Sequence, residues 1–144
     1  LGVCGTDVTY ESGHSFFELF TFPFGKTKIC LAGREEDALP GAAREAVAIA
    51  TKFTSFTRDF FHQRGIAVEI IKLNGSVELA PVLGLAPFIV DLVETGSTLK
   101  AHNLTVLEEL ATTEVKLIAN RPYYKYHFRR IEGLVREFQR KPNE

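Results

Sequence analysis

The stretch ELAPVLGLAPFIVDLVETGSTL, residues 78–99, is the most informative part of the sequence about fold and function. It reads as a turn of small residues around Gly84 and Ala86, then an apolar strand at 88–92, then a polar loop that leads into a helix. A strand followed by a small polar loop and the start of a helix presents backbone N–H groups to an anion. The stretch therefore predicts a binding site for a phosphorylated ligand.

The polar loop of this stretch carries two kinds of functional group. Thr95, Ser97 and Thr98 offer hydroxyls, and the glycine among them lets the backbone approach a ligand closely. Asp91 and Glu94 add carboxylates, which a site for phosphate alone does not need. A ligand with a phosphate at one end and sugar hydroxyls or Mg²⁺ at the other would use both kinds of group. An ordinary helix cap without a ligand is the alternative interpretation.

Composition narrows the class of protein. The chain has 144 residues, 45% hydrophobic and 24% charged, with a net charge of −1, which is typical of a globular protein with one core or two small lobes. The charge gives no basic field for nucleic acid, and no apolar run approaches the ~20 residues of a membrane helix. Cys4 and Cys30 and the four histidines show no metal-ligand spacing. We expect free thiols in the cytoplasm and no metal site built by the protein alone.

Short strands and helices alternate from 47 to 104, which indicates a parallel α/β sheet. The pattern predicts strands at 1–7, 16–20, 27–32, 47–51, 67–73 and 88–92. It predicts helices from Thr54 or Ser55 to Gly65, after a Ser76 cap, from Thr98 to His102, and from Pro122 to about Lys141. We expect 105–111 and 114–120 to be neighbouring strands, and 34–45 to be a surface loop.

Two polar segments follow predicted strands, Gly5-Thr6-Asp7 and the loop at 91–98. Ligands of open α/β sheets bind beyond the carboxyl ends of the strands, so both segments are candidates for binding. The chain has no methionine and opens on LGVCGTD, which is typical of a strand already under way. Because a domain rarely begins inside an element, we expect that an N-terminal segment is missing before Leu1.

The residues of 78–99 match a family signature without a departure. The matching positions are Glu78, Gly84, Ala86, Ile89, Asp91, Thr95, Gly96, Thr98 and Leu99. The flanking segments agree in the same order: GTD at 5–7, ATKF at 50–53, EIIKLNGSVELAP at 69–81 and NRPYYK at 120–125. On these residues the chain resembles ATP phosphoribosyltransferase, the first enzyme of histidine biosynthesis, over essentially its whole length.

The resemblance implies a fold of two α/β lobes, similar to periplasmic binding proteins, with parallel or mixed sheets. It implies a partial first lobe at 1–30, truncated at its N-terminus, a second lobe with the phosphoribosyl loop at 31–120, and a helix that returns to the first lobe at 121–144. No regulatory domain follows, so the chain is similar to the short form of the family. That form depends on a regulatory subunit resembling a histidyl-tRNA synthetase, and we expect a homo-oligomer as well.

The resemblance also implies the reaction, in which N1 of ATP takes the phosphoribosyl group of phosphoribosyl pyrophosphate and pyrophosphate leaves, usually with Mg²⁺. It assigns the 5′-phosphate to the residues of the loop turn, Thr95, Gly96, Ser97 and Thr98. It assigns the ribose hydroxyls to Asp91 and Glu94. Further candidates for substrate contact are Glu78, Lys52, Thr6 and Asp7. No residue is assigned as the general base.

A non-catalytic module that binds small molecules is the alternative from another class, because two-lobed α/β folds also serve as solute receptors. Such a receptor would lack the paired acids and the TGST turn at 95–98, and it would usually carry an export signal. This chain has the acids and the turn. The residues therefore favour the enzyme.

Overall fold

The computed structural model describes residues 1–37 and 45–140, and these fold into two compact units. One unit is continuous, Thr27–Thr112. The other combines the two ends of the chain, 1–26 and 113–140. The mixed α/β fold predicted from the sequence is confirmed. No helix of the described ranges is both long and apolar enough to cross a membrane.

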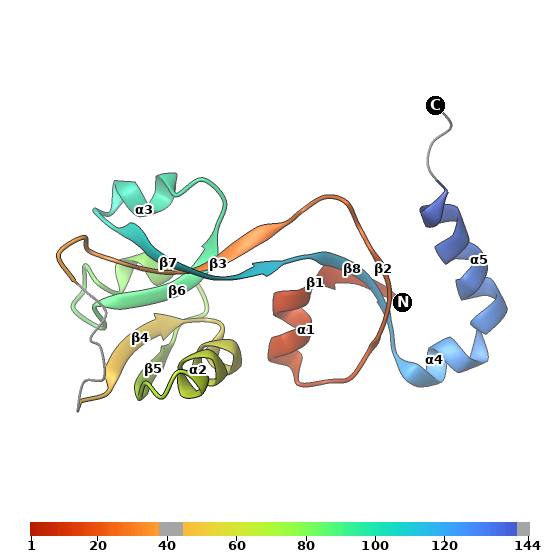
Figure 1. Cartoon of the computed structure of the whole chain (residues 1–144), viewed down its shortest axis with the longest axis horizontal. Coiled ribbons are helices and arrows are strands. Elements are labelled where there is room, and N and C mark those ends of the chain that lie inside the picture. Colours follow the sequence, from red (N-terminus) through yellow and green to blue (C-terminus); the bar gives the residue numbers. More distant parts are fainter. Residues whose placement is uncertain (38–44, 141–144) are drawn as a thin grey trace. The chain divides into compact units, whose positions relative to one another are not determined.

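The continuous unit is built on a five-stranded mixed sheet with the order β5-β4-β6-β3-β7 (Figure 1). Its strands are β3 (Thr27–Gly33), β4 (Val47–Thr51), β5 (Val68–Lys72), β6 (Phe88–Val93) and β7 (Thr105–Thr113). Its helices are α2 (Thr54–Gln63), the 3₁₀ turn η1 (Val77–Leu79) and α3 (Ser97–Ala101). β4 runs parallel to both β5 and β6, whereas β3 pairs with β6 antiparallel. The predicted parallel sheet is thus confirmed for β4, β5 and β6.

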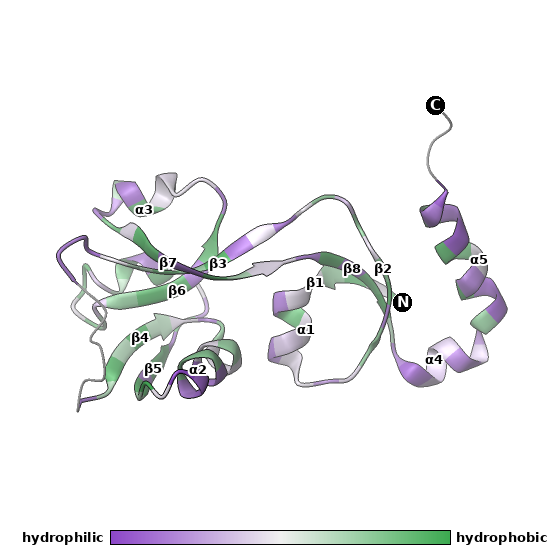
Figure 2. Cartoon of the chain, in the orientation of Figure 1, coloured by the Kyte–Doolittle hydropathy of each residue, from purple (hydrophilic) through white to green (hydrophobic). Residues whose placement is uncertain are grey.

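The central strands of this sheet are apolar on both faces, which is typical of strands covered on both sides. Ile49 and Val90 face a cluster that includes Phe61 of α2. The neighbouring Ala50 and Ile89 face a second cluster, which includes Val77 of η1 and residues of α3. Figure 2 shows the apolar colouring along β4 and β6. The sheet therefore lies between α2 on one face and η1 with α3 on the other.

The terminal unit is a three-stranded antiparallel sheet with the order β1-β8-β2. Its elements are β1 (Gly2–Gly5), α1 (Thr6–Ser12), β2 (Phe17–Thr21), β8 (Val115–Ala119), α4 (Arg121–Tyr126) and α5 (Phe128–Gln139). Phe22 and Leu117 pack with Ile131 and Val135 of α5 in its core. This core is small, and much of α5 is polar in Figure 2.

Strand positions agree with the sequence better than strand partners do. The strand 47–51 is confirmed to the residue, and α2 ends before Gly65 as predicted. However, β7 and β8 are not neighbours, since β8 pairs with β1 and β2 in the other sheet. Alternation of apolar residues identifies a strand but does not choose its partner.

Helix starts and ends account for most of the remaining errors. Thr6 and Asp7 open α1 instead of a loop. Phe53 occupies the N-cap of α2 and no side chain caps that helix, so Thr54 and Ser55 are not caps. Ser76 has left-handed backbone angles (φ 51) and also makes no capping bond. These backbones are held by tertiary packing, which local propensity does not report.

The predicted last helix is two helices, because the chain bends at His127 (φ −116) between α4 and α5. Half of its predicted apolar stripe is exposed, namely Phe128, Leu134 and Phe138, and within α5 only Ile131 and Val135 are buried. Asn120 caps α4 by accepting a hydrogen bond from the Tyr123 N–H at 2.7 Å. The predicted loop at 34–45 and the helix end at Lys141 fall largely or wholly outside the described residues.

Candidate functional site

The loop that follows β6 lies beside η1 at one end of the mixed sheet. Ile89 and Leu99, which flank the polar residues, are buried in the same apolar cluster as Val77 of η1. Because side chains alternate along a strand, Asp91 is on the same face of β6 as Ile89 and thus on the face of η1. The buried residues on either side of the loop fix its two ends, and its polar middle is left at the surface.

A cavity of about 330 Å³ is hollowed between this loop and η1, within the range of small-molecule sites. Its lining is Glu78, Asp91, Leu92, Val93, Glu94, Thr95, Gly96, Ser97, Thr98 and Leu99. The structure therefore brings together Glu78 and every residue of the loop that the sequence singled out. Leu92 and Val93 were not singled out, and Leu99 was named only as a position of the signature, although all three belong to the same stretch.

The loop turn presents hydroxyls to this cavity. Thr95 Oγ1 lies 3.1 Å from Ser97 Oγ and accepts a longer hydrogen bond of 3.4 Å from the Ser97 N–H. Gly96 turns the chain with φ 77, a left-handed angle that favours glycine. Within the described residues, the hydroxyl of Thr98 makes no hydrogen bond. The turn thus has donors that a ligand can use.

The cavity is also lined by three carboxylates, those of Glu78, Asp91 and Glu94. Asp91 accepts a hydrogen bond at Oδ1 from the Leu92 N–H at 2.8 Å. Burial raises the pKa of Asp91 above its ordinary value of 3.8. The Leu92 N–H and Lys52 lower this pKa, and Glu78 raises it further. A cavity lined by both hydroxyls and carboxylates is suited to a ligand of mixed character, with an anionic group and hydroxyls of its own.

Lys52 lies in the turn between β4 and α2, and its side chain is exposed. Its ammonium sits 5.0 Å from the centroid of the Phe53 ring, and its charge acts on Asp91. Lys52 does not line the cavity, but it is a cation close enough to act on Asp91, which does. That location fits the predicted role of facing phosphate charge.

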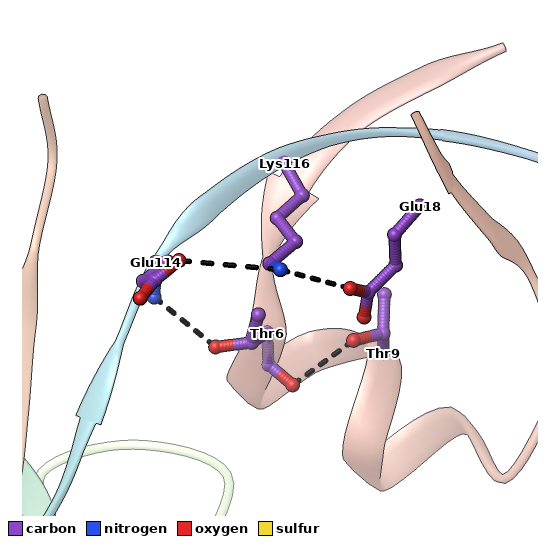
Figure 3. A network of polar contacts seen from close by, with 5 residues as sticks. All are labelled: Thr6, Thr9, Glu18, Glu114 and Lys116. Carbon is purple, nitrogen blue, oxygen red and sulfur yellow. Dashed lines mark hydrogen bonds and ion pairs between the residues drawn. The ribbon is translucent and has the colours of Figure 1, made fainter. Parts of the chain in front are cut away.

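Thr6 and Asp7 belong to the terminal unit, where Thr6 has partners of its own (Figure 3). The Thr6 N–H donates to the Glu114 carbonyl at 2.9 Å, and the Glu114 N–H donates to Thr6 Oγ1 at 3.1 Å. Thr9 Oγ1 also donates to the Thr6 carbonyl at 3.0 Å. Asp7 stands in the first turn of α1. Thr6 thus serves to join α1 to the start of β8.

Thr51 is a residue near this site that sequence reasoning missed. It is fully buried at the end of β4, where its hydroxyl donates to the Val90 carbonyl at 2.7 Å and accepts from the Phe53 N–H at 2.9 Å. The signal in the sequence is a polar residue that closes the apolar run VAIAT and belongs to the family-like segment ATKF at 50–53. That signal does not reveal a bond to a strand 39 residues away.

The described residues include no group of three or more His, Cys, Asp or Glu side chains that could hold a metal ion. The carboxylates of the cavity therefore fit a cation only if other ligands accompany it. Mg²⁺ is often bound in this way, by one or two carboxylates together with the phosphates of a substrate.

The fold and the cavity define a class of protein, an α/β protein of two units with a cavity lined by hydroxyls and carboxylates. Solved structures agree on the fold, since the aliphatic sulphonate binding protein SsuA of Escherichia coli aligns with 92% of the chain at TM-score 0.57 and 14% identity. That likeness concerns the fold alone.

The sequence model of the ATP phosphoribosyltransferase family matches residues 1–140, and the chain belongs to that family. An ATP phosphoribosyltransferase of Clostridioides difficile is 39% identical over 99% of this chain and 68% of its own length. The ATP phosphoribosyl transferase (HisG:HisZ) complex from Thermotoga maritima contains a chain with TM-score 0.85 and 36% identity, aligned over 96% of this chain and 67% of that one. The chain thus spans about two thirds of these relatives. The family catalyses the first step of histidine biosynthesis and is of glycosyltransferase type.

Proposed function

We propose that the cavity between η1 and the loop after β6 is the phosphoribosyl pyrophosphate site of an ATP phosphoribosyltransferase. The observation that carries this proposal is the gathering of Glu78, both loop acids and the TGST turn around one cavity. The family's reaction needs a site of this kind, because the substrate has a 5′-phosphate at one end, two ribose hydroxyls and a pyrophosphate. Family membership favours the enzyme over a non-catalytic binding module.

The turn at 95–98 would hold the 5′-phosphate with hydroxyls and backbone N–H groups. Asp91 and Glu94 would accept hydrogen bonds from the ribose hydroxyls, and Lys52 would face the pyrophosphate. N1 of the adenine then forms a bond to C1′ as the C1′–O bond breaks and pyrophosphate leaves with the bonding electrons. Because charge separates at C1′ in this step, orientation and electrostatics supply most of the acceleration. We keep Thr6 and Asp7 as further candidates from the terminal unit.

Mg²⁺, when bound, would neutralise the leaving pyrophosphate. In our proposal it arrives with the substrate, and the carboxylates of Asp91, Glu94 or Glu78 complete its ligand set. The chain's own residues then orient the ribose between the phosphate turn and the acids.

We also propose the family's partners for this chain. A relative has been solved as a HisG:HisZ complex, and a similar regulatory subunit, together with copies of this chain, is the assembly that we expect. Both cysteines are free, which fits a location in the cytoplasm.

Replacing Thr98 tests the site directly. Thr98→Val keeps the shape but removes a donor to the phosphate, and we expect the Kd of phosphoribosyl pyrophosphate with Mg²⁺ to rise about tenfold by calorimetry. Thr105→Val is the matched control, because Thr105 is exposed on β7 outside the cavity. If both variants bind as tightly as the unmodified protein, the assignment of this cavity is wrong.

A further inference from the structure

Thr51 is a polar side chain in a fully buried position, and it has two partners. Its hydroxyl donates to the Val90 carbonyl at 2.7 Å and accepts from the Phe53 N–H at 2.9 Å. Its own carbonyl accepts from the Leu73 N–H at 3.1 Å. One residue therefore joins the end of β4 to the residue after β5 and to Val90 within β6, and these three strands are neighbours in the sheet.

Both hydroxyl partners of Thr51 stand next to a charged residue of the site. Val90 immediately precedes Asp91, and Phe53 immediately follows Lys52. The parallel pairing of β4 with β6 ends at Thr51 and Val90. Beyond that pair β6 continues to Val93 beside β3, whereas the chain after Thr51 turns toward α2. The hydroxyl of Thr51 therefore links the β4–α2 turn to β6 at the point where their pairing ends.

A second buried threonine shows that burial alone does not require such bonds. Thr57 of α2 is as buried as Thr51, yet its hydroxyl has no hydrogen-bond partner in the structure. A buried hydroxyl without a partner is unfavourable, and valine would fill the same space without that cost. The two bonds of Thr51 are therefore a specific feature of its position between the β4–α2 turn and β6.

We propose that Thr51 is a positioning residue of the phosphoribosyl site, whose hydroxyl holds the turn that carries Lys52 against the strand that carries Asp91. The inference rests on the proposed function of the cavity. It adds that the distance between the cation and the carboxylate of the site is set by a buried hydroxyl that touches no substrate.

The surroundings of Asp91 show what this link controls. Lys52 is the cation that acts on Asp91, from the β4–α2 turn, and Glu78 opposes it from η1. Glu94 follows on the same loop, and Cys30 is the cross-strand neighbour on β3. The ammonium of Lys52 lies over the ring of Phe53, so the turn holds this positive charge in one position. There it can contact the pyrophosphate while Asp91 contacts the ribose.

The test compares three variants by calorimetry with phosphoribosyl pyrophosphate and Mg²⁺ on the full protein. Thr51→Val removes both hydrogen bonds, and we expect the Kd to rise about tenfold. Thr51→Ser keeps the hydroxyl, and we expect binding within about twofold of the unmodified protein. Thr57→Val, the matched control, should leave binding unchanged. Equal binding by Thr51→Val and Thr57→Val would overturn the proposal.

A coupling measurement separates positioning from a general loss of structure. Lys52→Met should weaken binding in the unmodified protein but add little in Thr51→Val, because the lysine is already displaced there. If the double variant instead shows a rise in Kd equal to the product of the two single rises, the proposal is contradicted. If Thr51→Val does not fold, Thr51→Ala and Thr51→Ser give the same comparison, since these two differ by the hydroxyl alone.

Thr98→Val distinguishes the two hypotheses. If Thr98→Val binds normally, the proposed function of the cavity fails. If Thr98→Val binds weakly while Thr51→Val binds normally, only the role of Thr51 fails.

Discussion

Two strand ends of this molecule look alike in the sequence and differ in the structure. Gly5-Thr6-Asp7 runs from the last residue of β1 into α1, and the segment 91–98 runs from the end of β6 into α3. Both combine glycine, a hydroxyl and an acid. In the first, Thr6 is fully engaged with Glu114 and Thr9. In the second, the hydroxyls bond mainly to each other and line a cavity. The two regions thus differ in the internal partners of their hydroxyls, and this difference is why we propose the second region as the phosphate site.

The largest expected effect on this comparison comes from Asp91→Asn. Losing a charge-assisted hydrogen bond costs roughly 1.5–3 kcal/mol, so the Kd of phosphoribosyl pyrophosphate should rise about tenfold or more. Because burial raises the pKa of Asp91, binding by the unmodified protein should weaken as the pH falls through that raised value. The asparagine variant should lose this pH dependence, as calorimetry over a pH series would reveal. A variant that keeps the same profile would exclude Asp91 as its source.

Stability should change in the opposite direction for the same substitution. A carboxyl whose pKa is raised in the native state binds its proton more tightly there than in the unfolded chain. Ionisation of Asp91 therefore costs stability above the raised pKa, and this cost disappears as the pH falls below about 3.8. Asp91→Asn should raise Tm at neutral pH and leave it unchanged in acid. A lower Tm at neutral pH would contradict the assigned cause.

A pair of glycines sharpens the comparison further. Gly96 and Gly13 both have left-handed backbones, φ 77 and 64, and a Cβ at either would meet nothing within 4 Å. Alanine at each should cost about 1–2 kcal/mol of stability from backbone strain. Only Gly96→Ala should also weaken binding of phosphoribosyl pyrophosphate, about tenfold, because it distorts the phosphate turn. Equal binding by the two variants would remove the distinction between the two regions.

A third substitution tests the structural side of the comparison. Thr6→Val leaves the Glu114 N–H without its acceptor, and we expect the free energy of unfolding to fall by about 1–2 kcal/mol in urea titrations. If the only role of Thr6 is to join α1 to β8, the Kd of phosphoribosyl pyrophosphate should stay within about twofold of that of the unmodified protein. A large loss of affinity at unchanged stability would instead make Thr6 a substrate contact.

The smallest effect is expected from the ion pair beside Thr6 (Figure 3). Lys116 Nζ lies 2.8 Å from Glu18 Oε2, and the Glu18 side chain is 53% exposed. Exposed pairs contribute at most about 1 kcal/mol, so Lys116→Gln should lower the free energy of unfolding by less than that and leave binding unchanged. A larger loss would mean that the network around Thr6 acts as one unit.

The sequence by itself determined the elements and the content of the site. The run VAIAT at 47–51 is continuous and apolar, so it is a buried strand in any fold that the chain adopts. The nine signature positions of 78–99 lie within one short stretch, and neighbours in sequence are held close by the covalent chain. Glu78 and the loop therefore gather around one cavity, as predicted.

Only the tertiary structure decided which of these polar groups have hydrogen-bond partners within the protein. The partner of Thr6 is 108 residues away, the partner of Thr51 is 39 residues away, and the separation of β7 from β8 depends on two different sheets. Such choices follow from strand pairing and burial across the whole fold, since a hydrogen-bond partner distant in sequence leaves no pattern near the residue that it binds. The amino acids thus specify which polar groups are present, and packing specifies which of them remain without internal hydrogen bonds and can contact a ligand.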